Sequence, residues 1–168
     1  MKKDLLSCMD ITRADFERII SLAAELKEGR GKPGAPKPFE GKSVGMIFAK
    51  SSTRTRVSFE VGIFELGGHP VYLDQSRTQR GRGETVPDTA RVLERYLSGI
   101  VIRTFAQQDL IDLAANAHIP IINALTDDFH PCQALTDMFT MYEYAHKLEG
   151  LKLAYFGDGA SNMANSLM

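Results

Sequence analysis

The sequence predicts an α/β fold: a doubly wound, four-stranded parallel sheet with helices on both faces, followed by the first strand and helix start of a second α/β domain. Four short apolar runs alternate with segments of helical periodicity, which is typical of parallel strands joined by right-handed crossover helices. The 168 residues suffice for one domain with a sizeable core and a short extra piece. With 43% hydrophobic and 24% charged residues, the composition is that of an ordinary globular protein.

The first predicted helix begins at Thr12, because a threonine followed three residues later by Asp15 is a helix-start pattern. Apolar side chains then recur on one helical face, at Phe16, Ile19, Ile20, Ala23 and Ala24. Gly29 ends the helix, and residues 29–41, rich in glycine, proline and lysine, are predicted to form a loop.

The four predicted strands are the apolar runs 44–49, 70–73, 99–103 and 120–125. The helices between them cover roughly 54–66, 86–97 and 106–117, and Pro87 suits the first turn of the second helix. A further helix, about 132–146, carries a stripe of apolar residues at helical spacing, which we expect to pack in the core or against another domain. This stripe consists of Leu135, Met138, Phe139 and Tyr142.

A polar break at 147–150 marks the predicted domain boundary, so that residues 1–147 form one domain and 148–168 the start of a second. The apolar run 151–156 is predicted to be the first strand of that second domain, and Ser161 to open its first helix. The chain ends on this helix without a terminator, and we therefore expect it to be part of a longer protein.

Charge and cysteine content exclude several classes of function. The formal net charge of −1 disfavours nucleic acid and anionic membranes as main partners. The two cysteines, Cys8 and Cys132, form neither a disulfide framework nor a metal-ligand cluster, which is typical of a reducing cytoplasm. The charged N-terminus leads directly into a helical pattern and no long apolar run follows, so the sequence indicates neither a signal peptide nor a membrane span.

A run of hydroxyl and guanidinium side chains, Ser51-Ser52-Thr53-Arg54-Thr55-Arg56, stands between the first predicted strand and its following helix. Free backbone N–H groups and the positive end of the helix dipole lie at such a position, and arginine can hold two phosphate oxygens at once. The run therefore favours a phosphate site, with a capped helix and solvated arginines as the alternative. The Gly-x4-Gly-Lys-Ser/Thr pattern of a Walker loop is absent.

The other candidate polar groups also follow strands. Arg103 closes the third strand, and His130 and Gln133 come after the fourth. In open parallel sheets, ligands bind outside the carboxyl ends of the strands, where the strand order reverses. A 2-1-3-4 order would place Arg54 and Arg103 at one crevice. Taken alone, Arg103 could be a solvated strand end and His130 a helix-entry residue.

The chain resembles the aspartate/ornithine carbamoyltransferase family at two motifs. The first is the run 51–56 followed by Ser58-Phe59-Glu60, which is similar to the carbamoyl phosphate signature of that family, and the second is His130-Pro131-Cys132-Gln133. The resemblance covers essentially the whole chain. It implies transfer of the carbamoyl group of carbamoyl phosphate to the δ-amine of ornithine, which gives citrulline and phosphate in arginine biosynthesis or in arginine and citrulline metabolism.

The resemblance also implies roles for individual residues. The phosphate would be held by Ser52, Thr53, Arg54 and Thr55. The three catalytic candidates would contact the carbamoyl group: Arg103 bridges phosphate and carbonyl, His130 donates to the carbonyl oxygen, and Gln133 accepts from the NH2. Such a site stabilises the departing phosphate and the developing oxyanion with cations and N–H donors, and the reaction requires neither a metal nor a cofactor.

The segment 75–84 is polar, basic and punctuated by glycine. Taken alone, it could be a surface loop or a weak RNA-like basic patch. In the family this loop reaches into the site of the neighbouring subunit. The resemblance therefore implies that Gln79 contacts the phosphate across the interface of a homotrimer or of a multiple of trimers.

Three features favour ornithine as the amine acceptor. Aspartate enzymes carry a lysine in the 75–84 loop, whereas this chain has no lysine between Ser51 and His146. Cys132 stands where aspartate enzymes usually have threonine, and the run Asp88-Thr89-Ala90-Arg91-Val92-Leu93 looks ornithine-type. Asn162 matches the family asparagine that contacts the amino acid substrate. Putrescine, acetylornithine and aspartate are the alternative acceptors, because the discriminating residues lie mostly beyond this chain. We expect the 168 residues alone to be inactive.

Two other classes of function stay open. The glycines of Gly157-Asp158-Gly159, after the run 151–156, could open a dinucleotide-binding unit. However, Asn162 occupies the third glycine position of Gly-x-Gly-x-x-Gly, and no acidic residue lies downstream. The chain by itself could instead be a non-catalytic domain that binds a phosphate ligand.

Overall fold

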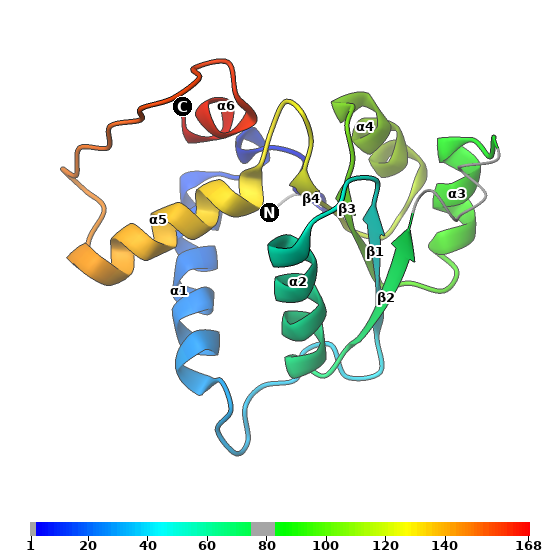
Figure 1. Cartoon of the computed structure of the whole chain (residues 1–168). Coiled ribbons are helices and arrows are strands. Elements are labelled where there is room, and N and C mark those ends of the chain that lie inside the picture. Colours follow the sequence, from blue (N-terminus) through cyan, green and yellow to red (C-terminus); the bar gives the residue numbers. More distant parts are fainter. Residues whose placement is uncertain (1–2, 75–82) are drawn as a thin grey trace.

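The computed structural model describes residues 3–74 and 83–168 (Figure 1). Its one sheet contains β1 (Ser43–Phe48), β2 (His69–Asp74), β3 (Gly99–Arg103) and β4 (Ile121–Leu125), all parallel. The strand order β2-β1-β3-β4 is the predicted one, and the predicted four-stranded fold is confirmed. The helices are η1 (Cys8–Asp10), α1 (Arg13–Gly29), α2 (Thr53–Glu65), α3 (Val86–Leu93), α4 (Gln107–Asn116), α5 (Pro131–Ala145) and α6 (Asn162–Leu167).

Helices cover both faces of the sheet, with α1, α2 and α5 on one side and α3 and α4 on the other (Figure 1). The alternation of side chains along β1 shows how the two faces are filled. Met46 and Phe48 are buried with Ile63 of α2. Ile47, between them, belongs to the opposite cluster, together with Ala90 of α3.

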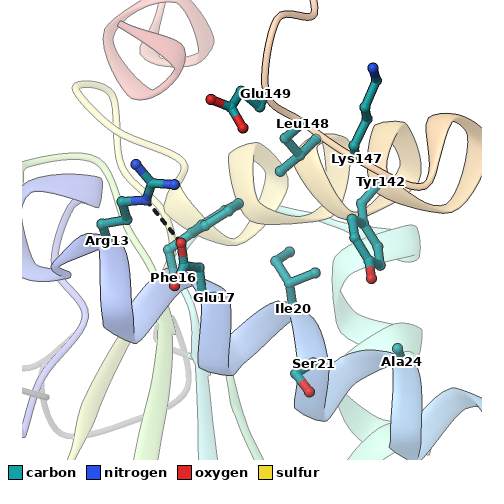
Figure 2. A pocket seen from close by; sticks show the side chains of 10 residues that line it. All are labelled: Arg13, Phe16, Glu17, Ile20, Ser21, Ala24, Tyr142, Lys147, Leu148 and Glu149. Carbon is teal, nitrogen blue, oxygen red and sulfur yellow. Dashed lines mark hydrogen bonds and ion pairs between the residues drawn. The ribbon is translucent and has the colours of Figure 1, made fainter.

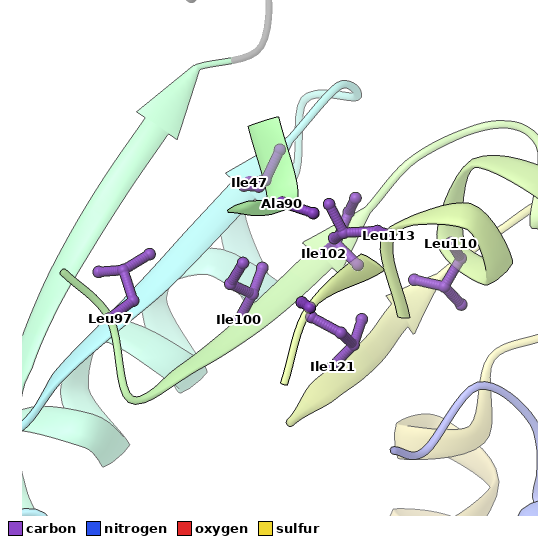
Figure 3. Close-up of a cluster of buried hydrophobic side chains, with 9 residues drawn as sticks. Ile47, Ala90, Leu97, Ile100, Ile102, Leu110, Leu113 and Ile121 are labelled. Atoms are coloured by element: carbon purple, nitrogen blue, oxygen red, sulfur yellow. The ribbon is translucent and has the colours of Figure 1, made fainter. Parts of the chain in front are cut away.

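The larger core cluster lies between the sheet and helices α3 and α4 (Figure 3). Ile100 and Ile102 of β3 and Leu110 and Leu113 of α4 are completely buried in it. Because β3 is covered on both faces, it is apolar along its length until Arg103. This packing fixes the carboxyl end of β3, where the first polar side chain of the strand appears.

The helix boundaries follow the sequence signals closely. The Thr12 side chain accepts from the Asp15 N–H and starts α1, which ends at Gly29 as predicted. α3 is shorter than the predicted helix 86–97, because the chain turns at 94–96 and buries Leu97 just ahead of β3. Within the described residues, no helix is long and apolar enough to span a bilayer.

The predicted strand at 151–156 is wrong. These residues form neither helix nor strand, and their large side chains are exposed, Leu153 by 53% and Phe156 by 94%. A strand needs a neighbour to bond its N–H and C=O groups, and in the described ranges no other strand pairs with this segment. The dinucleotide-binding alternative required a strand before Gly157 and therefore lacks its structural context.

Gly68, in the turn from α2 to β2, lies where two parts of the backbone approach closely. A Cβ there would be 2.9 Å from the Phe39 Cβ and 3.2 Å from the Ile63 carbonyl oxygen. We expect Gly68→Ala to destabilise the fold by about 1–3 kcal/mol, because the backbone holds both groups in place. Urea unfolding measures this change.

Gly62, inside α2, is the matched control. A Cβ there meets no described atom within 4 Å. Gly62→Ala should therefore stabilise the protein by about 0.5–1 kcal/mol, since alanine is the better helix former. Equal effects of the two substitutions would contradict the close packing at Gly68.

Candidate anion-binding site

A cavity of about 550 Å³ lies at the carboxyl ends of β1, β3 and β4. Its lining comes from three separate segments: Ser51, Ser52, Thr53, Arg54, Thr55, Ser58, Arg103, His130, Gln133 and Thr136. All the predicted carbamoyl phosphate contacts are among them except Gln79, which lies outside the described residues. The cavity is also at the point where the strand order reverses, as expected for a ligand site of a doubly wound sheet.

Strand register places Arg103 beside the run 51–56, which follows β1. Phe48 is paired with Arg103 in the sheet, and the Ala49 N–H donates to the Arg103 carbonyl oxygen at 2.8 Å. α2 starts at Thr53, with Ser52 as its extended N-cap residue. Within the described part of the chain, the Ser52 side chain makes no capping hydrogen bond. It therefore does not occupy the N–H groups of the first turn, which are the groups that bind anions.

The two arginines of the run have different surroundings. Arg54 is exposed and lines the cavity. The Arg56 guanidinium lies 3.7 Å from the centre of the Tyr72 ring, and its Nε is 3.3 Å from a Glu60 carboxylate oxygen. Since residues two apart in a helix do not share a face, Arg54 lines the cavity while Arg56 packs against β2.

Arg103 is a half-buried cation whose guanidinium forms few hydrogen bonds with the described residues. Its Nη1 lies 3.5 Å from Thr55 Oγ1, a long hydrogen bond, and its buried Nε has no partner among the described residues. Burial lowers the pKa of the Arg103 guanidinium from its ordinary value. A poorly solvated cation interacts strongly with an anion placed beside it, so Arg103 is well suited to bind one.

His130 is the N-cap residue of α5, and it lines the same cavity. The buried Nδ1 has no hydrogen-bond partner within the described residues. Burial lowers the pKa of His130, the charge of Arg103 lowers it further, and Asp137 acts in the opposite direction. The neutral ring is therefore favoured, and it can still donate one hydrogen bond to a ligand oxygen.

Gln133 lies in the first turn of α5. Its Nε2–H donates to Asp137 at 2.8 Å, which orients the side-chain amide. An amide held by its NH2 group can present its carbonyl oxygen as an acceptor, which is the role predicted for it.

Three hydroxyl residues of the lining had no individual role predicted for them: Ser51, Ser58 and Thr136. Helical spacing was the available signal, because Ser58 follows Thr55 by three residues and Thr136 follows Gln133 by three. Ser58 and Thr136 also line a second, smaller hollow of about 190 Å³ beside His130.

Cys132, within the second motif, does not have the properties of a nucleophile. Its thiol donates to the Asn123 carbonyl oxygen at 3.3 Å, and burial raises the pKa of Cys132 to about 12. A reactive cysteine needs a thiolate, so we interpret Cys132 as a packing residue. Within residues 3–74 and 83–168, no group of three or more His, Cys, Asp or Glu side chains could hold a metal ion.

Asn162, the predicted contact to the amino acid substrate, is the first residue of α6 and lies outside the cavity lining. The predicted helix start is confirmed, because the Ser161 Oγ accepts from the Ala164 N–H at 3.3 Å. The Asn162 Nδ2–H donates to the Thr126 carbonyl oxygen at 2.8 Å, which docks α6 on the loop between β4 and α5.

A larger hollow, of about 700 Å³, lies between α1 and the end of α5 (Figure 2). Phe16, Ile20 and Tyr142 line it, and Arg13 at its edge is already bonded to Glu17 at 2.9 Å. None of the predicted site residues in the described part of the chain is in this lining. The larger hollow therefore offers fewer groups that could bind or react with a ligand than the polar cavity does. We place the functional site in the polar cavity.

The burial of His130 makes folding stability depend on pH. Because the folded-state pKa of His130 is lowered, the unfolded chain binds the proton more readily, and stability is lost as pH falls below about 6.5, the ordinary histidine value. We expect wild-type protein to lose more stability than His130→Gln between about pH 7 and about pH 5. Urea unfolding at each pH measures this, with the exposed His69→Gln as the control for removing an imidazole. Identical pH profiles of wild type and His130→Gln would contradict it.

Residues 3–143 match the family model described as aspartate/ornithine carbamoyltransferase, carbamoyl-P binding domain. A protein of Anoxybacillus flavithermus named ornithine carbamoyltransferase is 54% identical over 166 residues, which are 99% of this chain and 52% of that protein. One of the same name from Syntrophus aciditrophicus is 53% identical over 99% of this chain and 55% of its own length. The chain thus spans about half the length of these relatives.

Solved structures of both substrate types share the fold. Ornithine carbamoyltransferase from Thermus thermophilus superposes with a TM-score of 0.92 at 40% identity, over 99% of this chain and 57% of that one. Aspartate transcarbamoylase from Trypanosoma cruzi, in complex with carbamoyl phosphate and aspartate, gives 0.89 at 28% identity, over 98% and 55%. The two sequence motifs meet at one cavity, and the family model covers most of the chain. The chain therefore belongs to the aspartate/ornithine carbamoyltransferase family.

Proposed function

We propose that this chain binds carbamoyl phosphate and supplies the carbamoyl phosphate half of an ornithine carbamoyltransferase. One observation carries the proposal: the start of α2, the end of β3 and the start of α5 bring Arg54, Arg103 and His130 to a single cavity. No two of these residues are close in sequence, so their meeting results from the fold.

The phosphate group fits the start of α2. Hydroxyls of Ser52, Thr53 and Thr55, backbone N–H groups of the first turn and the Arg54 guanidinium provide donors from one helix end. Arg103 adds a second guanidinium from β3. Two cations and a helix N-terminus match a ligand that carries a phosphate dianion.

The carbamoyl group fits the side formed by α5. When an amine attacks the carbamoyl carbon, negative charge develops on the carbonyl oxygen and then leaves with the phosphate. His130 in its neutral form donates to that oxygen, and Arg103 lies between it and the phosphate. Gln133, oriented by Asp137, accepts from the carbamoyl NH2.

Ornithine is the acceptor that we propose. It is supported by the names of the relatives and by the absence of lysine from 51–146. The aspartate transcarbamoylase neighbour illustrates the alternative acceptor. We place the domain boundary at 147/148, with Asn162 on the amine-binding side, and the free thiols of Cys8 and Cys132 support a cytoplasmic location.

Calorimetry with three ligands tests the site. Carbamoyl phosphate should bind more tightly than acetyl phosphate, which has a methyl group in place of the NH2, and inorganic phosphate should bind most weakly. Gln133→Leu should reduce the affinity for carbamoyl phosphate to that for acetyl phosphate and leave acetyl phosphate binding unchanged. Equal affinities of wild-type protein for all three ligands would contradict recognition of the carbamoyl group.

Carbamoyl transfer is tested in a chimera, in which these residues are joined to the second half of the Anoxybacillus flavithermus relative. Citrulline formation from ornithine, with no product from aspartate or putrescine, is the expected result. Product from aspartate instead would assign the alternative acceptor.

We also propose that the 75–84 loop completes the site of a neighbouring subunit in a homotrimer. If so, mixing chimeras that carry Gln79→Ala and Arg54→Ala should restore some intact sites, because each mutant supplies the residue that the other lacks. Activity of the mixture no higher than the mean of the two mutants would argue for sites built within one subunit.

A further inference from the structure

Ser166 of α6 holds the backbone of His130. Its Oγ accepts from the His130 N–H at 2.8 Å and donates to the Asn162 carbonyl oxygen, one helical turn earlier, at 2.7 Å. A hydroxyl has one donor and two acceptor positions, so it can form both bonds at once. Ser166 is only 7% exposed, so water competes little for these bonds.

The position of His130 in α5 explains why this contact matters. As the N-cap residue, His130 has a non-helical backbone, with φ −139° and ψ 66°, and its N–H precedes the hydrogen-bonded turns of the helix. Ser166 supplies the acceptor for that N–H. It thereby fixes the peptide plane from which the imidazole projects.

The imidazole itself has weak anchoring. Its buried Nδ1 finds no hydrogen-bond partner in the described residues. The charged groups that act on it are Arg103, from β3, and Asp137, from α5. The direction of the ring therefore depends on the backbone that carries it.

We propose that Ser166 is a positioning residue for His130, which holds the His130 backbone so that the imidazole faces the carbonyl oxygen of carbamoyl phosphate. The proposal rests on the function proposed above. The same hydroxyl also bonds to the carbonyl of Asn162, so it connects the residue that we assign to the amine substrate with the residue that we assign to the carbamoyl group.

The α6 helix provides a matched control. The Asn165 Nδ2–H donates to the Asp128 carbonyl oxygen at 3.0 Å, so it also ties α6 to the β4–α5 loop. This bond does not involve His130. Asn165→Ala therefore removes an equivalent tie without changing the support of the imidazole.

The first readout needs no ligand. The His130 ring resonance, identified by its loss in His130→Gln, is titrated by NMR in the 168-residue chain. In Ser166→Ala the pKa of His130 should move up towards the ordinary histidine value, because a ring on a loosened backbone can reach solvent. Asn165→Ala should titrate like wild type.

The second readout separates positioning from general damage. Ser166→Ala should weaken carbamoyl phosphate binding about tenfold, since one hydrogen bond to the carbonyl is misplaced, and should leave the affinity for inorganic phosphate unchanged. The pair Ser166→Thr and Ser166→Val differs by the hydroxyl in side chains of equal shape. The threonine variant should behave like wild type and the valine variant like Ser166→Ala. If the alanine variant folds poorly, this pair tests whether the Ser166 hydroxyl positions His130.

The outcomes distinguish the two proposals. If wild-type protein does not bind carbamoyl phosphate, the proposed function fails, and with it the positioning role. If it binds and the hydroxyl-free variants leave both the His130 titration and the affinity unchanged, Ser166 is not a positioning residue. Equal losses for carbamoyl phosphate and inorganic phosphate would also overturn the proposal, because they would indicate damage to the whole cavity.

Discussion

Replacing Arg103 by methionine is expected to weaken carbamoyl phosphate binding by about 2–5 kcal/mol, at least about 30-fold, without destabilising the fold. The two effects have one physical cause. In the free protein the guanidinium is half-buried, its Nε has no partner among the described residues, and its contact to Thr55 is long, at 3.5 Å. Among the described residues the guanidinium is thus a poorly solvated cation, and a bound anion would compensate for this cost.

Calorimetry and urea unfolding measure the two quantities on the same samples. Arg103→Met should keep or increase the free energy of unfolding, because an apolar chain of similar length is easier to bury. The control is Arg13→Met, which removes an equal charge from a side chain that is 88% exposed and paired with Glu17. It should change neither quantity by more than about 0.5 kcal/mol. A destabilised Arg103→Met protein with unchanged affinity would show that Arg103 has a structural role instead.

Strand positions were the most predictable part of this molecule, and the site follows from them. In β3 the run from Gly99 to Ile102 is apolar and Arg103 is not, so the sequence itself marks where the strand leaves the core. Because all parallel strands end at the same edge, the polar residues after β1, β3 and β4 had to lie near one another. The family resemblance was needed to assign individual roles to these residues.

Features that depend on contact with a distant segment of the chain were not predictable from the local sequence pattern. The run 151–156 has the apolar content of a strand, but strand formation also requires a neighbouring chain segment, which composition does not report. The contact between Ser166 and His130 joins residues 36 positions apart and has no periodic signal. By contrast, the different surroundings of Arg54 and Arg56 could have been inferred, because residues two apart lie on different helix faces.

The different surroundings of Arg54 and Arg56 can be tested by comparing two single substitutions at the start of α2. Arg54→Ala should weaken carbamoyl phosphate binding by about 2–4 kcal/mol, or about 30- to 1,000-fold, because it removes a charge-assisted contact to the phosphate. Its effect on stability should be small, since Arg54 is exposed and lines the cavity.

Arg56→Ala should have the opposite effects, although it removes the same charge two residues away. Its guanidinium packs on the Tyr72 ring at 3.7 Å and pairs with Glu60 at 3.3 Å, so its loss should reduce stability by about 0.5–1 kcal/mol. Carbamoyl phosphate affinity should change by less than about threefold, the effect of a long-range charge screened by solvent. Calorimetry measures the carbamoyl phosphate affinity of both variants, and urea unfolding measures their stability. Similar losses of affinity in the two variants would mean that the positive field of the run, rather than the Arg54 contact, binds the anion.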